Sequence, residues 1–336
     1  MKCSAISLYI FVLVLCHEGI AQLLDEKCVP NTKFVEKVTY GHQAKKGVTP
    51  WMALIRDSKE FICGGSLINK RFVLTAAHCF KNRPELFVKL GVYDQYCPPS
   101  NCTEVEEYKV VDRIAYNVNG VTSDIGLLKL DREVIYNDYI SPICIILDNT
   151  VDPLSVKKYS AYGWGMTHKG KPSRYLRLLS LRRSSATECN SMYDSFDEKV
   201  FCAGGSKGDT CHGDSGGPLI SRVKYNGTMI YAQMGVISLG SESCDSIGLY
   251  IDVMKHKSWI MEHSQVVDPE VKIMLKQAPE EPSQEWHMYY QVISELWWQD
   301  PNNQSQKILL EWKNKISLNQ RDNKSMPKLE YRSKTK

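Results

Sequence analysis

The feature that most constrains the fold is a long succession of short apolar runs between residues 51 and 252. Each run is rich in β-branched and aromatic side chains and is bounded by Gly, Pro, Asn or Asp. Examples are Phe72–Thr75, Phe87–Leu90, Lys109–Val111 and Ile230–Leu239. Many short strands at close intervals favour an antiparallel sandwich or barrel over a parallel sheet covered by helices. We therefore predict an all-β fold.

The apolar pattern changes period near residue 253. The residues that then share one helical face are Val253, Lys257, Ile260 and Met261. This spacing predicts a helix at the end of the folded region.

The composition changes again after residue 264. Residues 277–304 are rich in Pro, Gln, Asn and Glu, and residues beyond 318 are mostly polar and basic. We interpret 265–336 as a poorly ordered C-terminal extension. The alternatives are a docking helix or a membrane-surface segment. The side chains that could form such an amphipathic helix are Ile308, Leu309, Trp312 and Ile316.

The first 21 residues have the pattern of a secretory signal peptide. Lys2 precedes an apolar run from Ala5 to Cys16, and Gly19 and Ala21 are small residues suited to cleavage after Ala21. An uncleaved anchor is disfavoured because the run is too short to span about 30 Å of hydrocarbon. We expect an extracellular protein without a transmembrane segment. Removal of the leader leaves ten of the twelve cysteines, an even number suited to disulfides.

The net charge of +4 comes from the end of the chain. Residues 301–336 contain nine Lys or Arg and three Asp or Glu, and the remainder is slightly acidic. The composition therefore gives no support to a nucleic-acid-binding core.

Three segments carry residues suited to nucleophilic catalysis. Ser215 lies within Gly213–Pro218, where glycines allow a tight turn and bring backbone amides near its hydroxyl. A serine nucleophile needs a base and a group that orients the base. His78 in Thr75–Cys79 and Asp124 in Asp124–Leu128 supply these groups, in the chain order His, Asp, Ser.

Together with Gly163–Gly165, these segments resemble a trypsin-like member of the chymotrypsin family of serine endopeptidases over residues 38–264. The resemblance implies two antiparallel Greek-key β-barrels with the active site between them and a C-terminal helix. His78 and Asp124 would belong to the first barrel and Ser215 to the second.

The resemblance also assigns the groups around the nucleophile. The amides of Gly213 and Ser215 would form the oxyanion hole. Asp209 would lie at the floor of the substrate pocket, with Gly240 and Gly248 leaving its walls open, which implies cleavage after Arg or Lys. An alternative is that Asp209 is a solvated loop residue. A tryptophan usual in the family is replaced by Leu239, so the preference for more distant substrate residues is left open.

An activation site is implied at the start of the similar region. Cleavage after Lys37 would free the Val38 amine to pair with Asp214, although an exposed linker that happens to contain Lys-Val is an alternative. The disulfides implied by the resemblance are Cys63–Cys79, Cys189–Cys202 and Cys211–Cys244. Two further pairs, Cys97–Cys102 within a short insertion and Cys28–Cys144 from the cysteines that remain, complete the expected set. The last bond would keep a pro-segment, residues 22–37, attached after cleavage.

Four sequons predict N-glycosylation in a secreted protein, at Asn101, Asn226, Asn303 and Asn323. We expect no metal or cofactor. Some family members bind calcium in the loop that begins at Gly91, but Val92 replaces the carboxylate expected there, and acidic residues 104, 106 and 107 leave some doubt.

The sequence thus predicts a secreted zymogen of a trypsin-like serine endopeptidase active in regulated extracellular proteolysis. Its expected partners are protein or peptide substrates with Arg or Lys at the cleavage site, an activating protease and protein protease inhibitors. Two alternatives are an inactive protease homologue that acts as a binding module, and a protease anchored to membrane or matrix through its C-terminal extension.

Overall fold

The computed structural model describes residues 23–28, 42–116, 123–167, 170–193, 198–204, 210–240, 244 and 246–264. Several predictions fall outside these residues. They concern the leader 1–21, Lys37, Val38, Asp209, Asn303, Asn323 and the extension 265–336.

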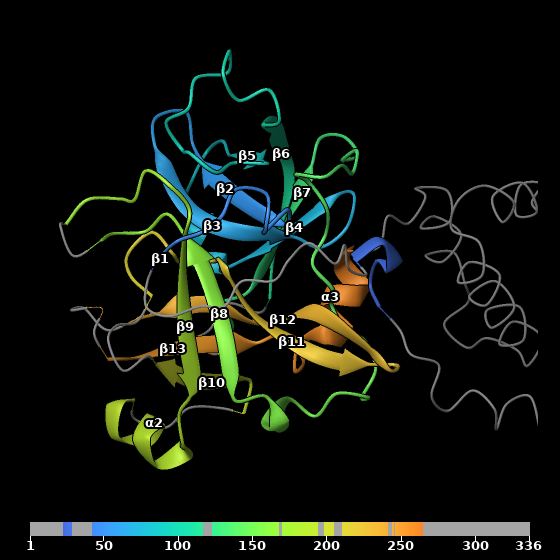
Figure 1. Ribbon diagram of the computed structural model, residues 1–336, viewed down its shortest axis with the longest axis vertical. Helices are drawn as coiled ribbons and strands as arrows, with labels where there is room; N and C mark the ends of the chain where they lie inside the picture. The colour runs from blue at the N-terminus through green and yellow to red at the C-terminus, as the bar shows by residue number, and fades with distance from the viewer. Residues whose placement is uncertain are drawn as a thin grey trace, which may run out of the picture. The chain divides into compact units, whose positions relative to one another are not determined.

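The first half of the described chain forms a closed antiparallel barrel in the strand order β2-β3-β4-β7-β6-β5 (Figure 1). The strands are β2 (Met52–Arg56), β3 (Phe61–Leu67), β4 (Phe72–Thr75), β5 (Phe87–Leu90), β6 (Glu106–Ala115) and β7 (Gly126–Leu130).

The second half forms another antiparallel sheet in the order β1-β9-β10-β13-β12-β11-β8. Because β8 also pairs with β9, six of these strands close on themselves and β1 is added at the edge of β9. The strands are β1 (His42–Gln43), β8 (Lys158–Gly163), β9 (Arg177–Arg183), β10 (Val200–Gly204), β11 (Pro218–Tyr225), β12 (Thr228–Leu239) and β13 (Ile247–Asp252). The predicted fold class, an all-β protein of two antiparallel barrels, is confirmed, and the structure shows that each barrel is closed by six strands.

The strands owe their stability to burial of their β-branched and aromatic residues. All four residues of β4 are buried, whereas β6 alternates, with Tyr108 and Val110 inside and Lys109 and Val111 outside. This two-residue period is the one expected for a strand that faces the core on one side and solvent on the other.

Short helices complete the described chain. The predicted C-terminal helix is α3 (Lys257–Ser264), in which Ile260 is fully buried; Val253 precedes it. The helix α2 (Ala186–Met192) was not predicted from the sequence, although Ser185 and Glu188 form a capping box at its start. Among the described residues, no helix combines the length and apolar character needed to cross a membrane.

The structure joins the ten described cysteines in pairs: Cys28–Cys144, Cys63–Cys79, Cys97–Cys102, Cys189–Cys202 and Cys211–Cys244. These are the pairs named in the sequence analysis. The short helix η1 (Glu26–Cys28) ends at the first of them.

The segment before Cys28 also makes non-covalent contacts with the connection between β7 and β8. The Leu24 amide donates to the Ile145 carbonyl at 3.0 Å, and the Tyr136 hydroxyl donates to Asp25 Oδ2 at 2.6 Å. This segment is therefore held by more than its disulfide.

Candidate active site

His78 and Asp124 extend from the same end of the first barrel. The strands β4 and β7 are neighbours whose ends pair at Thr75 and Gly126. His78 follows β4 on the 3-10 turn η2 (Ala77–Cys79), and Asp124 lies two residues before β7. Strand pairing therefore brings together two residues that are distant in the sequence.

Two hydrogen bonds fix the histidine relative to the aspartate. The His78 backbone N–H donates to Asp124 Oδ1 at 2.9 Å, and His78 Nδ1 lies 2.7 Å from Oδ2. The carboxylate thus holds the imidazole by its Nδ1 edge, which leaves Nε2 as the nitrogen that can accept a proton.

A third hydrogen bond to Asp124 comes from the second barrel. Ser238, at the end of β12, donates its hydroxyl to Asp124 Oδ2 at 2.6 Å. Burial raises the pKa of Asp124, but the hydrogen bonds from His78 and Ser238 outweigh it, so this pKa is lower than the ordinary value of 3.8. This role of Ser238 was not predicted from the sequence, because no local motif marks Ser238 as a partner of Asp124.

Ser215 lies opposite, in the turn that precedes β11. Its carbonyl accepts a hydrogen bond from the Gly64 amide of β3 at 2.9 Å, which ties this turn to the first barrel. Ser215, His78 and Asp124 all line one cavity of about 660 Å³. His78 Nε2 lies 3.8 Å from Cys79 Sγ, and no described hydrogen bond joins it to Ser215. Such catalytic hydrogen bonds are often long without substrate and tighten when it binds.

The backbone around Ser215 leaves two amide N–H groups without a described acceptor. Gly213 has φ of +94°, a conformation that favours glycine. Within the part of the chain that the structure describes, the amides of Gly213 and Ser215 donate to no acceptor. Unpaired N–H groups beside a nucleophile are suited to stabilise an oxyanion.

Asp214, between these two residues, is held by the backbone of two other segments. Its Oδ1 accepts from the Gly165 amide at 2.8 Å, and its Oδ2 accepts from the Cys211 amide at 3.0 Å. The carboxylate therefore anchors the turn on which both amides lie.

Comparison with known proteins assigns this arrangement to one family. A sequence profile of the trypsin family matches residues 38–260. The chain belongs to the trypsin family.

Its relatives include insect proteases that match it over most of their length. It is 32% identical to CLIP domain-containing serine protease B15 of Anopheles gambiae, over 68% of this chain and 70% of that protein. It is 34% identical to phenoloxidase-activating factor 3 of Holotrichia diomphalia, over 68% and 73%. It is 30% identical to the Spaetzle-processing enzyme of Drosophila melanogaster, over 73% and 77%.

The residues predicted to form the substrate pocket of this trypsin-family chain are described in part. Asp209 lies outside the described residues, but its neighbour Thr210 lines the cavity, with its hydroxyl 3.1 Å from that of Tyr250. Gly240 also lines the cavity, whereas Gly248 is buried in β13 and pairs with Ala203 of β10.

Leu239 stands at the edge of the same cavity, between Ser238 and Gly240. Its side chain is 44% exposed. It therefore adds an apolar surface to the lining of the cavity.

The described side chains that could hold a metal ion take part in a disulfide or in ion pairs instead. Cys63, Cys79 and His78 lie close together, but the two sulfurs form a disulfide. Of the acidic residues in the loop after Gly91, Glu104 pairs with Lys46, and Glu107 lies near a lysine and an arginine.

Two of the predicted glycosylation sites are described. Asn101 and Asn226 are both exposed, in a loop and at the turn between β11 and β12. Both are accessible to modification.

Proposed function

We propose that the chain is a secreted serine endopeptidase, made as a zymogen, that hydrolyses peptide bonds after Arg or Lys. The observation that carries this proposal is the hydrogen bond between His78 and Asp124 beside a cavity that Ser215 also lines. Membership of the trypsin family supports it, as do the amides of Gly213 and Ser215, which have no acceptor among the described residues.

Each side chain then has one role in an acyl-enzyme route. His78 takes the Ser215 proton as the hydroxyl attacks the substrate carbonyl, and returns it to the leaving amine. Asp124 keeps the imidazole in the required tautomer and stabilises its cationic form. The two amides receive the oxyanion, an interaction whose loss typically costs about 2.7–4 kcal/mol in the transition state.

Activation follows from cleavage after Lys37. The new Val38 amine, largely cationic at neutral pH, would pair with Asp214 and so order the turn that carries Gly213. The pro-segment 22–37 stays attached through Cys28–Cys144 and through the contacts of Leu24 and Asp25.

The biological setting is proposed from the relatives. Their names include a phenoloxidase-activating factor and a Spaetzle-processing enzyme. We infer that this chain acts outside the cell, in a cascade in which one protease activates it, it cleaves a protein substrate, and a protein inhibitor ends its activity.

Activity is tested by labelling with a fluorophosphonate before and after cleavage at Lys37. We expect one label per cleaved chain, none in the Ser215→Ala variant, and little in the uncleaved form. Absence of labelling in fully cleaved protein would contradict the proposed hydrolase and favour an inactive homologue.

Specificity is tested by profiling the cleaved protein with a peptide library. We expect cleavage after Arg and Lys, because a neutral substrate residue would leave a carboxylate at the floor of the pocket unpaired, at a cost of roughly 3–5 kcal/mol. An Asp209→Ser variant should lose this preference; an unchanged preference would refute the assignment of the pocket.

A further inference from the structure

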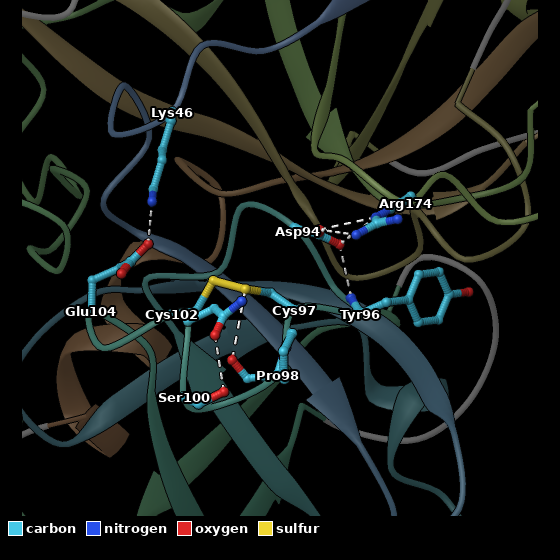
Figure 2. The surroundings of a disulfide bond; sticks show 10 residues. Lys46, Asp94, Tyr96, Cys97, Pro98, Ser100, Cys102, Glu104 and Arg174 are labelled. Atoms are coloured by element: carbon cyan, nitrogen blue, oxygen red, sulfur yellow. Dashed lines mark hydrogen bonds and ion pairs between the residues drawn. A yellow bond between two sulfur atoms is a disulfide. The ribbon is translucent and has the colours of Figure 1, made fainter.

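An ion pair joins a surface loop of the first barrel to the second barrel. Asp94, in the loop between β5 and β6, accepts hydrogen bonds from Arg174 Nε at 2.9 Å and Nη2 at 2.8 Å (Figure 2). The aspartate side chain is only 12% exposed, whereas that of Arg174 is 57% exposed. The Arg174 hydrogen bonds hold the pKa of Asp94 below its ordinary value.

The loop that carries Asp94 is constrained on its own side. The disulfide Cys97–Cys102 closes a short loop that begins three residues after Asp94. Lys46 forms an ion pair with Glu104 just beyond it, at 2.5 Å (Figure 2). Asp94 therefore offers Arg174 a fixed partner rather than a mobile one.

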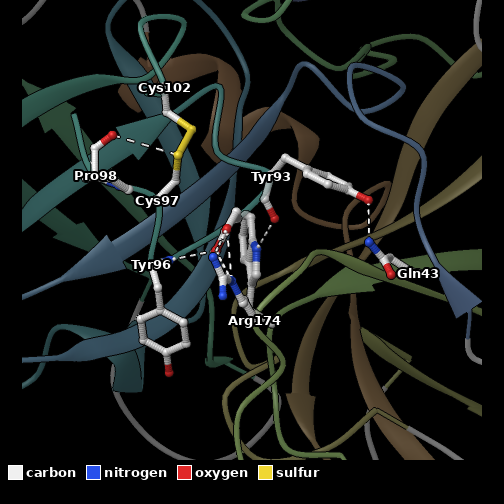
Figure 3. A network of polar contacts seen from close by, with 9 residues as sticks. Gln43, Tyr93, Tyr96, Cys97, Pro98, Cys102 and Arg174 are labelled. Atoms are coloured by element: carbon white, nitrogen blue, oxygen red, sulfur yellow. Dashed lines mark hydrogen bonds and ion pairs between the residues drawn. A yellow bond between two sulfur atoms is a disulfide. The ribbon is translucent and has the colours of Figure 1, made fainter. Parts of the chain in front are cut away.

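Backbone hydrogen bonds continue the contact on both sides of the ion pair. The Gln95 amide donates to the Arg174 carbonyl at 3.0 Å, and the Leu176 amide donates to the Tyr93 carbonyl at 2.9 Å. Trp164 also donates its indole N–H to the Tyr93 carbonyl, at 3.2 Å. Figure 3 shows the side-chain contacts around Arg174 and, farther along, the Tyr93 hydroxyl that accepts a hydrogen bond from Gln43.

The segment beside Arg174 in turn holds the Trp164–Gly165 peptide. The Ser173 amide donates to the carbonyls of Trp164 and Gly165 at 3.0 and 3.1 Å. Ser173 is adjacent to Arg174, so a shift of the arginine backbone moves the donor that positions this peptide.

Gly165 and Met166, in the segment that follows Trp164, form hydrogen bonds with the residues on both sides of Gly213. The Gly165 amide donates to Asp214 Oδ1 at 2.8 Å, and the Met166 amide donates to the His212 carbonyl at 2.8 Å. His212 and Asp214 are the two neighbours of Gly213 in the chain. These two hydrogen bonds therefore link the chain on both sides of Gly213 to the segment that the Ser173 amide contacts.

We propose that the Asp94–Arg174 ion pair positions the oxyanion hole, through Ser173 and the Trp164–Met166 segment. Arg174 is a positioning residue, since it lies outside the groups that line the cavity. This inference rests on the proposed function, because it concerns the rate of the same reaction. A mutation along a contiguous network of contacts can change the coupling between its ends by about twofold to thirtyfold, and the effect expected here lies within that range.

The competing interpretation is that the ion pair only adds stability. A surface ion pair is typically worth about 0–1 kcal/mol, and its loss would leave the catalytic rate of the folded enzyme unchanged. A measurement of rate per titrated active site separates the two interpretations.

The experiment compares Arg174→Gln, Asp94→Asn and the double variant with the parent, each cleaved after Lys37 and titrated for active sites. We expect kcat for a peptide amide to fall by about threefold to tenfold with little change in KM. The double variant should fall no further than either single variant, because the two residues act as one unit. Arg174→Lys should lie between the parent and Arg174→Gln, because lysine keeps the charge but loses the two-nitrogen geometry.

Binding of a peptide aldehyde supplies a readout that stability alone does not change. Its hemiacetal oxygen occupies the oxyanion hole, so its affinity should fall in parallel with kcat. The affinity of a cleaved product peptide, which places no developing charge there, should stay the same.

The matched control is Arg83→Gln. Arg83 forms a partly buried ion pair with Asp57 at 2.9 Å, and neither residue lines the cavity. We expect this variant to keep the parent kcat and aldehyde affinity.

Two failures are distinguishable. If the parent is active and Arg174→Gln keeps its kcat and aldehyde affinity, the positioning role is overturned and the proposed hydrolase stands. If the cleaved parent neither hydrolyses peptides nor reacts with a fluorophosphonate, both the proposed function and this inference fail.

Discussion

The two sides of the active-site cavity are built by different means. On the first-barrel side, His78 and Asp124 are held by hydrogen bonds that involve their side chains. On the second-barrel side, Ser215 and Gly213 lie on a turn whose shape comes from backbone amides and glycine conformation. We refer to these as the acid–base side and the nucleophile side.

The two sides should therefore be sensitive to different kinds of substitution. The acid–base side depends on the chemical identity of a buried carboxylate, because a neutral replacement changes which nitrogen of His78 carries the proton. The nucleophile side depends on space: a Cβ added at Gly165 would lie only 2.5 Å from Asp214 Cγ. A conservative change of charge should thus damage one side, and one added methyl group the other.

The largest expected effect of the predictions that follow is that of Asp124→Asn on the acid–base side. We expect kcat to fall by about 10⁴-fold, because the amide favours the wrong imidazole tautomer while the packing is retained. Steady-state kinetics with active-site titration check this. Asp112→Asn, on the exposed outer face of β6, is the control and should be neutral. A loss smaller than tenfold would show that the acid–base side does not depend on this charge.

On the nucleophile side, Gly165→Ala should lower kcat by about 10²–10³-fold, the usual result of losing one oxyanion donor. The added methyl displaces the Asp214 carboxylate, and the Gly213 amide moves with it. The control is Gly235→Ala, which crowds Phe201 within the barrel at 3.0 Å. That variant should lower the melting temperature but not kcat. Equal kcat losses in the two variants would mean that crowding acts through general destabilisation.

Ser238→Ala tests whether the two sides are independent. Ser238 belongs to the second barrel but donates to Asp124 at 2.6 Å. We expect kcat to fall by about tenfold, close to the lower end of the roughly 1.5–3 kcal/mol that a hydrogen bond to a charged group contributes. Ser221→Ala on β11 removes a comparable hydroxyl hydrogen bond, 3.0 Å long and remote from the cavity, and should not alter kcat. An unaffected Ser238→Ala enzyme would show that the first barrel alone orients Asp124.

The smallest expected effect is on the pH dependence of stability. The pKa of Asp124 is lowered in the folded state, so the folded protein binds this proton less readily than the unfolded chain. Its stabilising contribution is complete above the ordinary value of 3.8 and is lost as the pH falls toward the lower folded value. Urea unfolding of the parent and Asp124→Asn should therefore differ least at low pH. A difference that grows on acidification would contradict the sign of this pKa shift.

Much of the molecule could be predicted from local patterns. Runs such as Phe72–Thr75 indicated strands because β-branched and aromatic residues pack well on a pleated, buried surface. The segments around His78, Asp124 and Ser215 indicated a catalytic site because each has a distinctive local sequence. The short helix α2 was missed, although its capping box was present in the sequence.

The contacts between distant segments could not be predicted in this way. Ser238 has no local sequence feature that marks a donor to Asp124, which is 114 residues away. In the sequence, Asp94 and Arg174 likewise look like ordinary charged loop residues. The structure shows that they form an ion pair although 80 residues separate them. Neither pair has a periodic or motif signal of its own.

Local sequence patterns were enough to predict the strand-rich fold class and the residue types of the site. Both depend on the order of apolar, glycine and catalytic residues within short segments. Only the tertiary structure decided which carboxylate oxygen meets His78, which hydroxyl supports it, and which segments frame Gly213. These relations arise from strand pairing and loop packing between the two barrels, and such contacts depend on the whole chain rather than on any local segment.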